Sequence, residues 1–318
     1  MTDEMIVGVD LGGTKIDVVL ANDRGDIKVR TLRETCASEG RDLVIDRIID
    51  AIKQVSSGVR VDAIGIGAAG ACEFETGVIT YSPNLPGWYN ISLKSLIEAK
   101  VGLPTYLDND AAVAAIGEHT FGAGIGIDHM ILVTLGTGIG GGIIINGELY
   151  RGASGSAGEI GHMTIDLNGP RCSCGKKGCW EVLASGSALE REATARIEAG
   201  EETSIERNDP NCSAEVSARS VHKAALSGDR LANELIALTS YYLGIGLVNL
   251  VNIFNPQLIL IGGGLSNMGA MLIDPAVETV REHAFEISAK AARVELSSLG
   301  GDAGPLGAVA LALRNMAR

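Results

Sequence analysis

Apolar and polar positions in the first 60 residues follow two different periods. Residues 5–10 are an apolar run that ends at a glycine turn, and residues 15–21 and 27–32 continue as a hairpin around Asn22–Gly25. Residues 41–55 repeat apolar side chains at helical spacing. The pattern therefore predicts a strand and a hairpin followed by one amphipathic helix.

The next segments pair buried strands with short helices. Residues 63–67 are a small apolar run that predicts a buried strand. We expect a short helix over 92–100 and a strand over 104–107. That strand ends at Asp108-Asn109-Asp110, where an alanine-rich helix begins.

A strand, a glycine turn and a returning strand occur in both halves of the chain. Residues 129–135 predict a strand, Gly136–Gly142 a glycine-rich turn, and residues 143–145 the returning strand. When the two strand–turn–strand segments are aligned, Asp10 corresponds to Thr134 and Gly12 to Gly136, which indicates a weak internal repeat.

The last third of the chain is mainly helical. Residues 214–254 predict helices with short breaks, which Pro256 ends. A strand over 258–261 then enters the glycines 262–264. The chain closes with a helix near 305–316.

Length and composition allow two ordinary domains or one large one. The chain has 318 residues, 46% hydrophobic and only 4% aromatic, so its cores must use Ile, Val, Leu and Ala. The net charge of −13 disfavours a nucleic-acid partner. No uninterrupted apolar run reaches the roughly 18 residues of a membrane span, and the acidic start does not resemble a secretory signal. We therefore expect a cytoplasmic protein.

One histidine and three cysteines form an H-x9-C-x-C-x4-C pattern between Glu159 and Glu181. Three thiols and one imidazole are a ligand set for tetrahedral Zn²⁺. A disulfide with a spare thiol is the alternative, but Cys-x-Cys does not easily close on itself, and a reducing compartment favours metal. The cluster consists of His162, Cys172, Cys174 and Cys179. The remaining cysteines, Cys36, Cys72 and Cys212, are interpreted as ordinary small residues.

Three glycine-rich turns are candidates for nucleotide binding. The turn Asp10–Lys15 offers backbone N–H groups, a hydroxyl and an ammonium to a phosphate, but lacks the spacing of a Walker A loop. A plain hairpin turn explains it equally well. The turn Gly136–Gly142 with Thr137 strengthens the phosphate interpretation. Gly262–Gly264 could pack against an adenine ring or could simply lead from a strand into a helix.

Asp108-Asn109-Asp110 lies at the carboxyl end of a predicted strand, where open α/β sheets bind ligands. One of the two carboxylates is expected to cap the following helix. The other can accept a proton from a substrate hydroxyl, as phosphoryl transfer requires.

Together these motifs resemble the ROK family of sugar kinases. The resemblance rests on D-L-G-G-T-K, P-N-L-P-G-W, L-D-N-D, L-G-T-G-I-G-G-G, E-I-G-H, the cysteine cluster and I-G-G-G, and it covers essentially the whole chain. It implies the actin-like, ribonuclease-H-type α/β fold, with two domains and a ligand cleft between them. We expect residues 1–118 with 302–318 to form the smaller domain and 119–301 the larger one, which carries the zinc loop.

The resemblance also implies roles for individual residues. Asp110 would be the general base, and His162 would bind both zinc and sugar. The implied sugar-binding residues are Gly70, Asn84, Asn109, Asp110, Glu159, His162 and Glu181. The implied ATP-binding residues are Asp10, Gly12, Gly13, Thr14, Lys15, Thr137, Gly138, Gly263 and Gly264. Mg²⁺ would accompany ATP, and the zinc would be structural.

The sequence departs from the family pattern at one position. The family often has D-N-D-A-N, whereas this chain has Ala112 in place of the last Asn. We expect altered local hydrogen bonding without loss of activity.

The family resemblance implies ATP-dependent phosphorylation of glucose at its C6 hydroxyl. The nearest alternative is the same reaction on fructose, mannose, allose, N-acetylglucosamine or N-acetylmannosamine. A sugar-responsive repressor is a second alternative, disfavoured because Asp10 comes too early for a preceding helix-turn-helix. An actin-like or chaperone ATPase would need neither the cysteine cluster nor the L-D-N-D acid. We expect a dimer or tetramer, a hexose and ATP as ligands, and no nucleic-acid or membrane partner.

Overall fold

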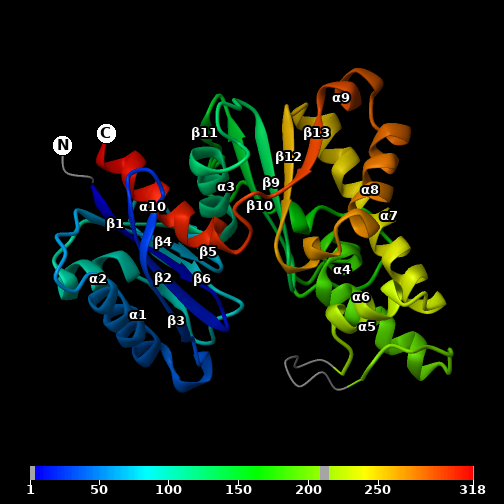
Figure 1. The fold of residues 1–318 in the computed structure, drawn as a ribbon, viewed down its shortest axis with the longest axis horizontal. Helices are drawn as coiled ribbons and strands as arrows, with labels where there is room; N and C mark the ends of the chain where they lie inside the picture. The colour runs from blue at the N-terminus through cyan, green and yellow to red at the C-terminus, as the bar shows by residue number, and fades with distance from the viewer. Residues whose placement is uncertain (1–3, 208–214, 318) are drawn as a thin grey trace. The chain divides into compact units, whose positions relative to one another are not determined.

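The computed structural model describes residues 4–207 and 215–317, which divide into two compact units (Figure 1). The first unit runs to Leu132 and also contains Gly142–Gly158 and the residues from Ser297 onward; the second contains Val133–Gly141 and Glu159–Leu296. These divisions differ from the predicted boundaries at 118/119 and 301/302. Residues around 148 belong to the first unit because they pack against its helix α3.

A five-stranded sheet of order β3-β2-β1-β4-β8 forms the first unit. The central strand β1 (Met5–Leu11) pairs antiparallel with β2 (Lys15–Asn22) and parallel with β4 (Ala63–Ala68). Strand β3 (Ile27–Glu34) extends the hairpin, and β8 (Thr105–Asn109) runs parallel to β4. The hairpin and the parallel pairs bring the carboxyl ends of β1, β4 and β8 to the same edge of the sheet.

Helices cover both faces of this sheet (Figure 1). Because successive strand residues face opposite sides, Val7 and Val9 join the core under α1 (Arg41–Val55) and α2 (Leu93–Val101). Ile6 instead joins the core under α10. The helices on this second side are α3 (Asp110–Phe121) and α10 (Ala303–Met316).

Two glycines let α10 approach the sheet closely. A Cβ atom at Gly8 would lie 2.2 Å from the carbonyl oxygen of Pro305, and one at Gly65 would lie 1.8 Å from that of Ala308. Any side chain at either position would push α10 off the sheet, so these glycines are required by packing.

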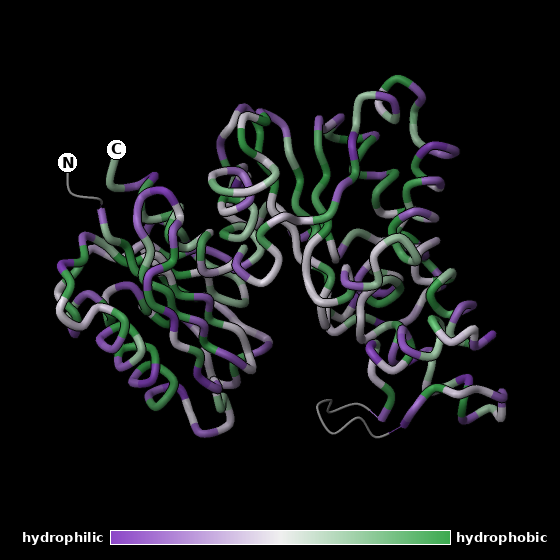
Figure 2. The backbone as a smooth tube through the Cα atoms, viewed as in Figure 1, coloured by the Kyte–Doolittle hydropathy of each residue, from purple (hydrophilic) through white to green (hydrophobic). Residues whose placement is uncertain are grey.

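The second unit contains helices α4 to α9, strands β12 and β13, and the parts of β9 and β10 next to their turn; β11 and the remaining parts of β9 and β10 belong to the first unit. The second five-stranded sheet has the order β11-β10-β9-β12-β13. Its strands are β9 (Met130–Leu135), β10 (Ile139–Ile145), β11 (Glu148–Leu149), β12 (Leu258–Gly262) and β13 (Arg293–Leu296). The helices are α4 (Glu181–Ala184), α5 (Gly186–Glu198), α6 (Ala218–Leu226), α7 (Arg230–Phe254), α8 (Ala270–His283) and α9 (Glu286–Ala291). In Figure 2 the apolar colour runs along the strands, whereas apolar and polar residues alternate along the helices.

Helix α7 is the only one in the described residues that is long and apolar enough to cross a membrane. More than half of its apolar window is buried, and it packs against α8 and the shorter helices α4, α5 and α6. We therefore interpret it as the core helix of the second unit.

Short elements complete the described chain. A small antiparallel sheet has the order β5-β6-β7. The short strands are β5 (Ala71–Glu73), β6 (Val78–Tyr81) and β7 (Tyr89–Ile91). The 3₁₀ helices are η1 (Ala37–Glu39), η2 (Ile160–His162), η3 (Gly264–Met268) and η4 (Gly300–Asp302).

The glycine turn between β9 and β10 is shorter than predicted. Strand β10 begins at Ile139, so the turn comprises only residues 136–138 and the next three glycines are part of the strand. Gly142 shows the reason, because a Cβ there would lie 2.4 Å from the Cβ of Ala115 on α3. The glycine run therefore serves helix packing as well as the turn.

Candidate functional site

The first glycine turn, between β1 and β2, is held rigid by its own backbone and by Thr35. The Gly12 N–H donates to the Lys15 carbonyl at 2.9 Å, and the Thr35 hydroxyl donates to the Gly12 carbonyl at 2.8 Å. Thr14 and Lys15 remain exposed. The turn can therefore present a hydroxyl and an ammonium group to a phosphate without first becoming ordered.

Gly13 brings the loop with Asn84 against this turn. A Cβ at Gly13 would lie 2.9 Å from both the Cβ and the carbonyl oxygen of Asn84. The structure thus places a predicted phosphate-binding glycine directly beside a predicted sugar-binding residue, both within the first unit.

Asp10 is a partly buried carboxylate just before the same turn. Burial raises its pKa to about 6, and Lys15 only partly offsets that effect. Because the folded-state pKa is above the usual value of 3.8, ionised Asp10 opposes folding. The unfavourable contribution develops as the pH rises from about 4 through about 6.

We expect Asp10→Asn to raise the free energy of unfolding of the ligand-free protein by about 1–3 kcal/mol at pH 7.5. The gain should shrink toward pH 5, where Asp10 is mostly protonated. Denaturant titrations of both proteins at the two pH values measure this difference. If Asp10 serves Mg·ATP, the same variant should bind Mg·ATP more weakly, so stability and ligand affinity move in opposite directions. Equal stability at both pH values would contradict the assigned charge penalty.

Asn109, and neither aspartate, caps helix α3, so the prediction of an aspartate N-cap is wrong. Its Oδ1 accepts the N–H groups of Ala111 at 3.0 Å and Ala112 at 3.1 Å. Its Nδ2 donates to the carbonyl of Gly70 at 3.0 Å and to Oδ1 of Asp110 at 3.0 Å. Asn109 therefore fixes both the Gly70 turn and the Asp110 carboxylate.

The two aspartates have different partners. Asp108 is 4% exposed, and its Oδ2 accepts a hydrogen bond of 2.9 Å from Nε of Arg151 and forms an ion pair of 2.9 Å with Nη2 of the same guanidinium. The guanidinium also stacks on Phe74 at 3.9 Å. Burial raises the pKa of Asp108 and Arg151 partly lowers it. Asp110 is less buried, and its Oδ1 accepts from Asn109 and from the Ala111 N–H at 2.8 Å. Asp110, at the first turn of α3, is therefore the better candidate for a base.

The predicted metal ligands lie together in the second unit. One ligand atom from each of the four residues lies within 4.8 Å of the others. The Cys174 and Cys179 sulfurs are 3.6 Å apart, and Cys172 Sγ is 3.7 Å from Nδ1 of His162. A tetrahedron with Zn–S bonds of about 2.3 Å has sulfur–sulfur edges of about 3.8 Å, so the geometry fits zinc. A disulfide, at about 2.05 Å, is excluded at these distances.

The environment of the thiols differs across this cluster. Burial raises the pKa of Cys179 to about 12, whereas the backbone N–H of Lys176 lowers the pKa of Cys174. A bound cation would favour the thiolate form of both. The other described cysteines, Cys36 and Cys72, lie outside the cluster, and Cys212 lies outside the described residues.

The two ring nitrogens of His162 have different neighbours. Its Nδ1 points to the cysteines, and its Nε2 lies 3.9 Å from Oε2 of Glu159. A ligand-binding role shared with Glu159 is therefore compatible with metal binding through the other ring nitrogen.

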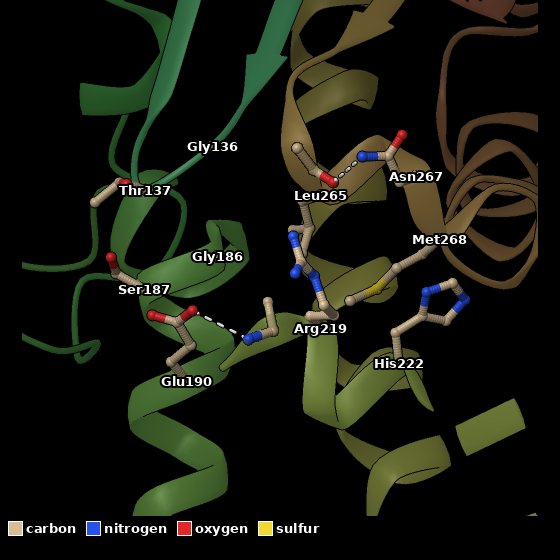
Figure 3. A pocket seen from close by; sticks show the side chains of 12 residues that line it. Gly136, Thr137, Gly186, Ser187, Glu190, Arg219, His222, Leu265, Asn267 and Met268 are labelled. Carbon is tan, nitrogen blue, oxygen red and sulfur yellow. Dashed lines mark hydrogen bonds between the residues drawn. The ribbon is translucent and has the colours of Figure 1, made fainter. Parts of the chain in front are cut away.

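A cavity of about 420 Å³ in the second unit joins the second and third glycine turns (Figure 3). The predicted residues Thr137 and Gly264 line it, whereas Gly138 and Gly263 are not among its lining residues. Its walls come from the β9–β10 turn, α5, α6 and η3. The full lining is Gly136, Thr137, Gly186, Ser187, Glu190, Ala218, Arg219, His222, Gly264, Leu265, Asn267 and Met268.

Most of this lining could not be recognised from the sequence. Glu190 lies on α5, Arg219 and His222 lie on α6, and Met268 lies on η3, and no local motif marks these residues. The Glu190 carboxylate accepts the Ala218 N–H at 3.0 Å, which joins α5 to the start of α6 (Figure 3). The cavity offers glycine backbone, one carboxylate, one guanidinium and the apolar side chain of Met268, a suitable mixture for a nucleoside.

The predicted sites are thus distributed over both units. The first unit holds Gly70, Asn84, Asn109 and Asp110 with the first glycine turn. The second holds Glu159, His162 and Glu181 with the remaining turns and the cavity. In the first unit Gly13 lies beside Asn84, and Asn109 contacts Gly70 and Asp110. In the second unit His162 lies beside Glu159.

Known proteins are similar to this chain along nearly its whole length. A family model described as "ROK family" matches residues 6–315. A glucokinase of Thermotoga maritima is 36% identical over 308 residues, covering 96% of each chain. A xylose repressor of Caldicellulosiruptor bescii is 34% identical over 321 residues, 98% of this chain and 78% of the repressor.

A solved structure supports the fold as well. The ROK family glucokinase from Streptomyces griseus, in complex with glucose and AMPPNP, is 37% identical, with a TM-score of 0.86 over 98% of this chain and 99% of that one. This match confirms the predicted α/β fold of the actin-like class.

Proposed function

The chain belongs to the ROK family, and on that premise we propose that it is a kinase that transfers a phosphoryl group from ATP to the C6 hydroxyl of glucose. The product would be glucose 6-phosphate. Glucokinases at 36–37% identity over nearly the full length of both chains support this assignment.

The observation that carries the proposal is the orientation of Asp110. Its carboxylate is held by Asn109 and Ala111 at the carboxyl end of β8, while Asp108 is already engaged by Arg151. We therefore propose that Asp108 supports the loop and that Asp110 receives the proton of a sugar hydroxyl as the hydroxyl attacks phosphorus.

The sugar-binding roles proposed for the remaining residues rest on the family resemblance. We propose that Glu159, His162 and Glu181 hold hydroxyls at the anomeric end of the sugar, and that Asn84 and Gly70 are also sugar-binding residues. Asn109 uses both ends of its amide within the protein, so its main role would be to orient Asp110.

ATP binding is proposed at the glycine turns and the cavity. Gly12, Gly13, Thr14 and Lys15 would bind phosphate oxygens, as would Thr137 and the following backbone, with Gly263 and Gly264 beside the adenosine. Mg²⁺ bound with ATP would neutralise phosphate charge, and Asp10 would be its nearest carboxylate in the first turn.

A zinc ion held by His162, Cys172, Cys174 and Cys179 would have four protein ligands. Such a closed site is structural, because a catalytic zinc keeps a position for water or substrate. We propose that it shapes the loop that carries Glu159 and Glu181. The protein is further proposed to act in the cytoplasm as a homo-oligomer, a dimer or tetramer, without a nucleic-acid or membrane partner.

Two other functions would use many of the same residues. The same chemistry on another hexose or N-acetylhexosamine would use most of the same residues. A sugar-responsive regulator is favoured by the similarity to the xylose repressor. The oriented Asp110 favours a kinase, because sugar binding alone needs no general base.

A coupled assay with Mg·ATP and a panel of hexoses tests the proposal. We expect glucose to give the highest kcat/KM. Faster turnover with N-acetylmannosamine or fructose would show that this sugar, and not glucose, is the substrate. Sugar binding without turnover on any panel member would favour the regulator.

A further inference from the structure

The segment that directly follows the cysteine cluster contacts the β9–β10 turn at three points. The Ile139 N–H donates to Oε2 of Glu181 at 3.0 Å. The Gly186 N–H donates to the Gly136 carbonyl at 2.9 Å, and the Ser187 N–H to the Thr137 carbonyl at 3.4 Å. These three hydrogen bonds join the turn and the first residue of β10 to residues 181–187.

Gly138 lies very close to the side chain of Glu181. A Cβ at Gly138 would lie 2.1 Å from Oε2 of Glu181, although Gly138 does not need a positive φ angle. A Cβ at Gly136, two residues earlier in the same turn, would meet nothing within 4 Å. A side chain at 138 would therefore displace the Glu181 carboxylate from its present position.

The residue directly before Glu181 is held firmly in place. Trp180 is fully buried, and its Nε1 donates to the Tyr242 carbonyl at 2.9 Å. A Cβ at Gly246 on α7 would lie 2.0 Å from the indole ring, so the ring lies flat against the helix backbone. Oε1 of Glu181 lies 3.9 Å from Cys172 Sγ. Glu181 is thus placed between the cysteine cluster and the turn by a fixed neighbour.

We propose that Glu181 is a positioning residue for the β9–β10 turn. Residue 138 is a glycine because a side chain there would occupy the place of the Glu181 carboxylate. One side chain then joins the cysteine cluster, the proposed sugar site and the proposed phosphate turn. A displaced Glu181 would disturb the sugar site and the turn together. The sugar part of this inference rests on the proposed function.

Hydrogen exchange of the ligand-free, full-length protein tests the connection without any substrate. Mass spectrometry of peptides covering 136–141 should show at least tenfold faster exchange in Glu181→Ala. Glu181→Gln retains an acceptor oxygen for the Ile139 N–H and should restore most of the protection. Equal exchange in wild type and Glu181→Ala, with both proteins folded, would overturn the proposal.

Glucose binding without nucleotide then tests the role of Gly138. We expect Gly138→Ala to raise the glucose Kd at least tenfold by calorimetry. Gly301→Ala adds the same methyl group at a glycine where a Cβ would meet nothing within 4 Å, and should leave that Kd within about twofold. Equal effects of the two variants would contradict the assignment of Gly138 to Glu181. If wild type binds no hexose, the proposed function fails, and the exchange measurement still decides the connection.

Discussion

Replacing Asp110 by Asn is expected to lower kcat about 10³-fold while the glucose Kd stays within about threefold. Asparagine has the same shape and keeps an oxygen that can accept from Asn109 and from the Ala111 N–H. It cannot take a proton from the sugar hydroxyl. Ground-state binding should therefore survive while the reaction step is lost.

Asp108→Asn is the matched control for Asp110→Asn, because it changes the neighbouring carboxylate in the same way. Asp108 is bound to Arg151, so this variant should lose roughly 1–3 kcal/mol of stability and much less of its kcat. Steady-state kinetics, glucose calorimetry and thermal melts of both variants separate the two roles. Near-normal turnover in Asp110→Asn, or a larger loss in Asp108→Asn, would show that the base is assigned wrongly.

The sequence predicts local elements and short motifs well because their causes are local. Helix α1 has the predicted bounds, since its apolar stripe and its flanking glycine and serine lie within one segment. The four cluster residues lie within 18 positions of each other, so their spacing alone indicates a metal site. The strand–turn–strand repeat is likewise visible in short glycine patterns.

Features that depend on distant contacts were not predicted. The choice of Asn109 as the cap depends on Gly70 offering a carbonyl to its amide, across 39 positions. The partner of Asp108, Arg151, is 43 positions away. The cavity lining needs α5, α6 and η3 to meet, and the constraint on Gly138 comes from Glu181 on another segment. None of these pairings has a signature in local periodicity.

Removing the metal from the cysteine cluster is expected to weaken glucose binding at least tenfold and to lower the melting temperature by several degrees. Structural zinc contributes on the order of 10–16 kcal/mol of apparent binding energy in zinc peptides. Without it, the loop between His162 and Cys179 would be held by its hydrogen bonds, such as the Cys172 N–H to the Lys176 carbonyl, and by the small apolar cluster of Cys172 and Cys179 with Val182. Glu159 and Glu181, at its two ends, would then lose their fixed spacing.

Cys179→Ser tests the same effect without a chelator, since it removes a buried thiol at the centre of the cluster. Cys36→Ser removes a thiol of the first unit and is the control, with zinc content and glucose Kd unchanged. Elemental analysis should give one zinc per chain in wild type and in the control, and much less in Cys179→Ser. Because the cluster joins the sugar loop to Glu181, metal loss should also speed hydrogen exchange over residues 136–141. A metal-free protein with unchanged glucose Kd and melting temperature would show that the cluster does not support the sugar site.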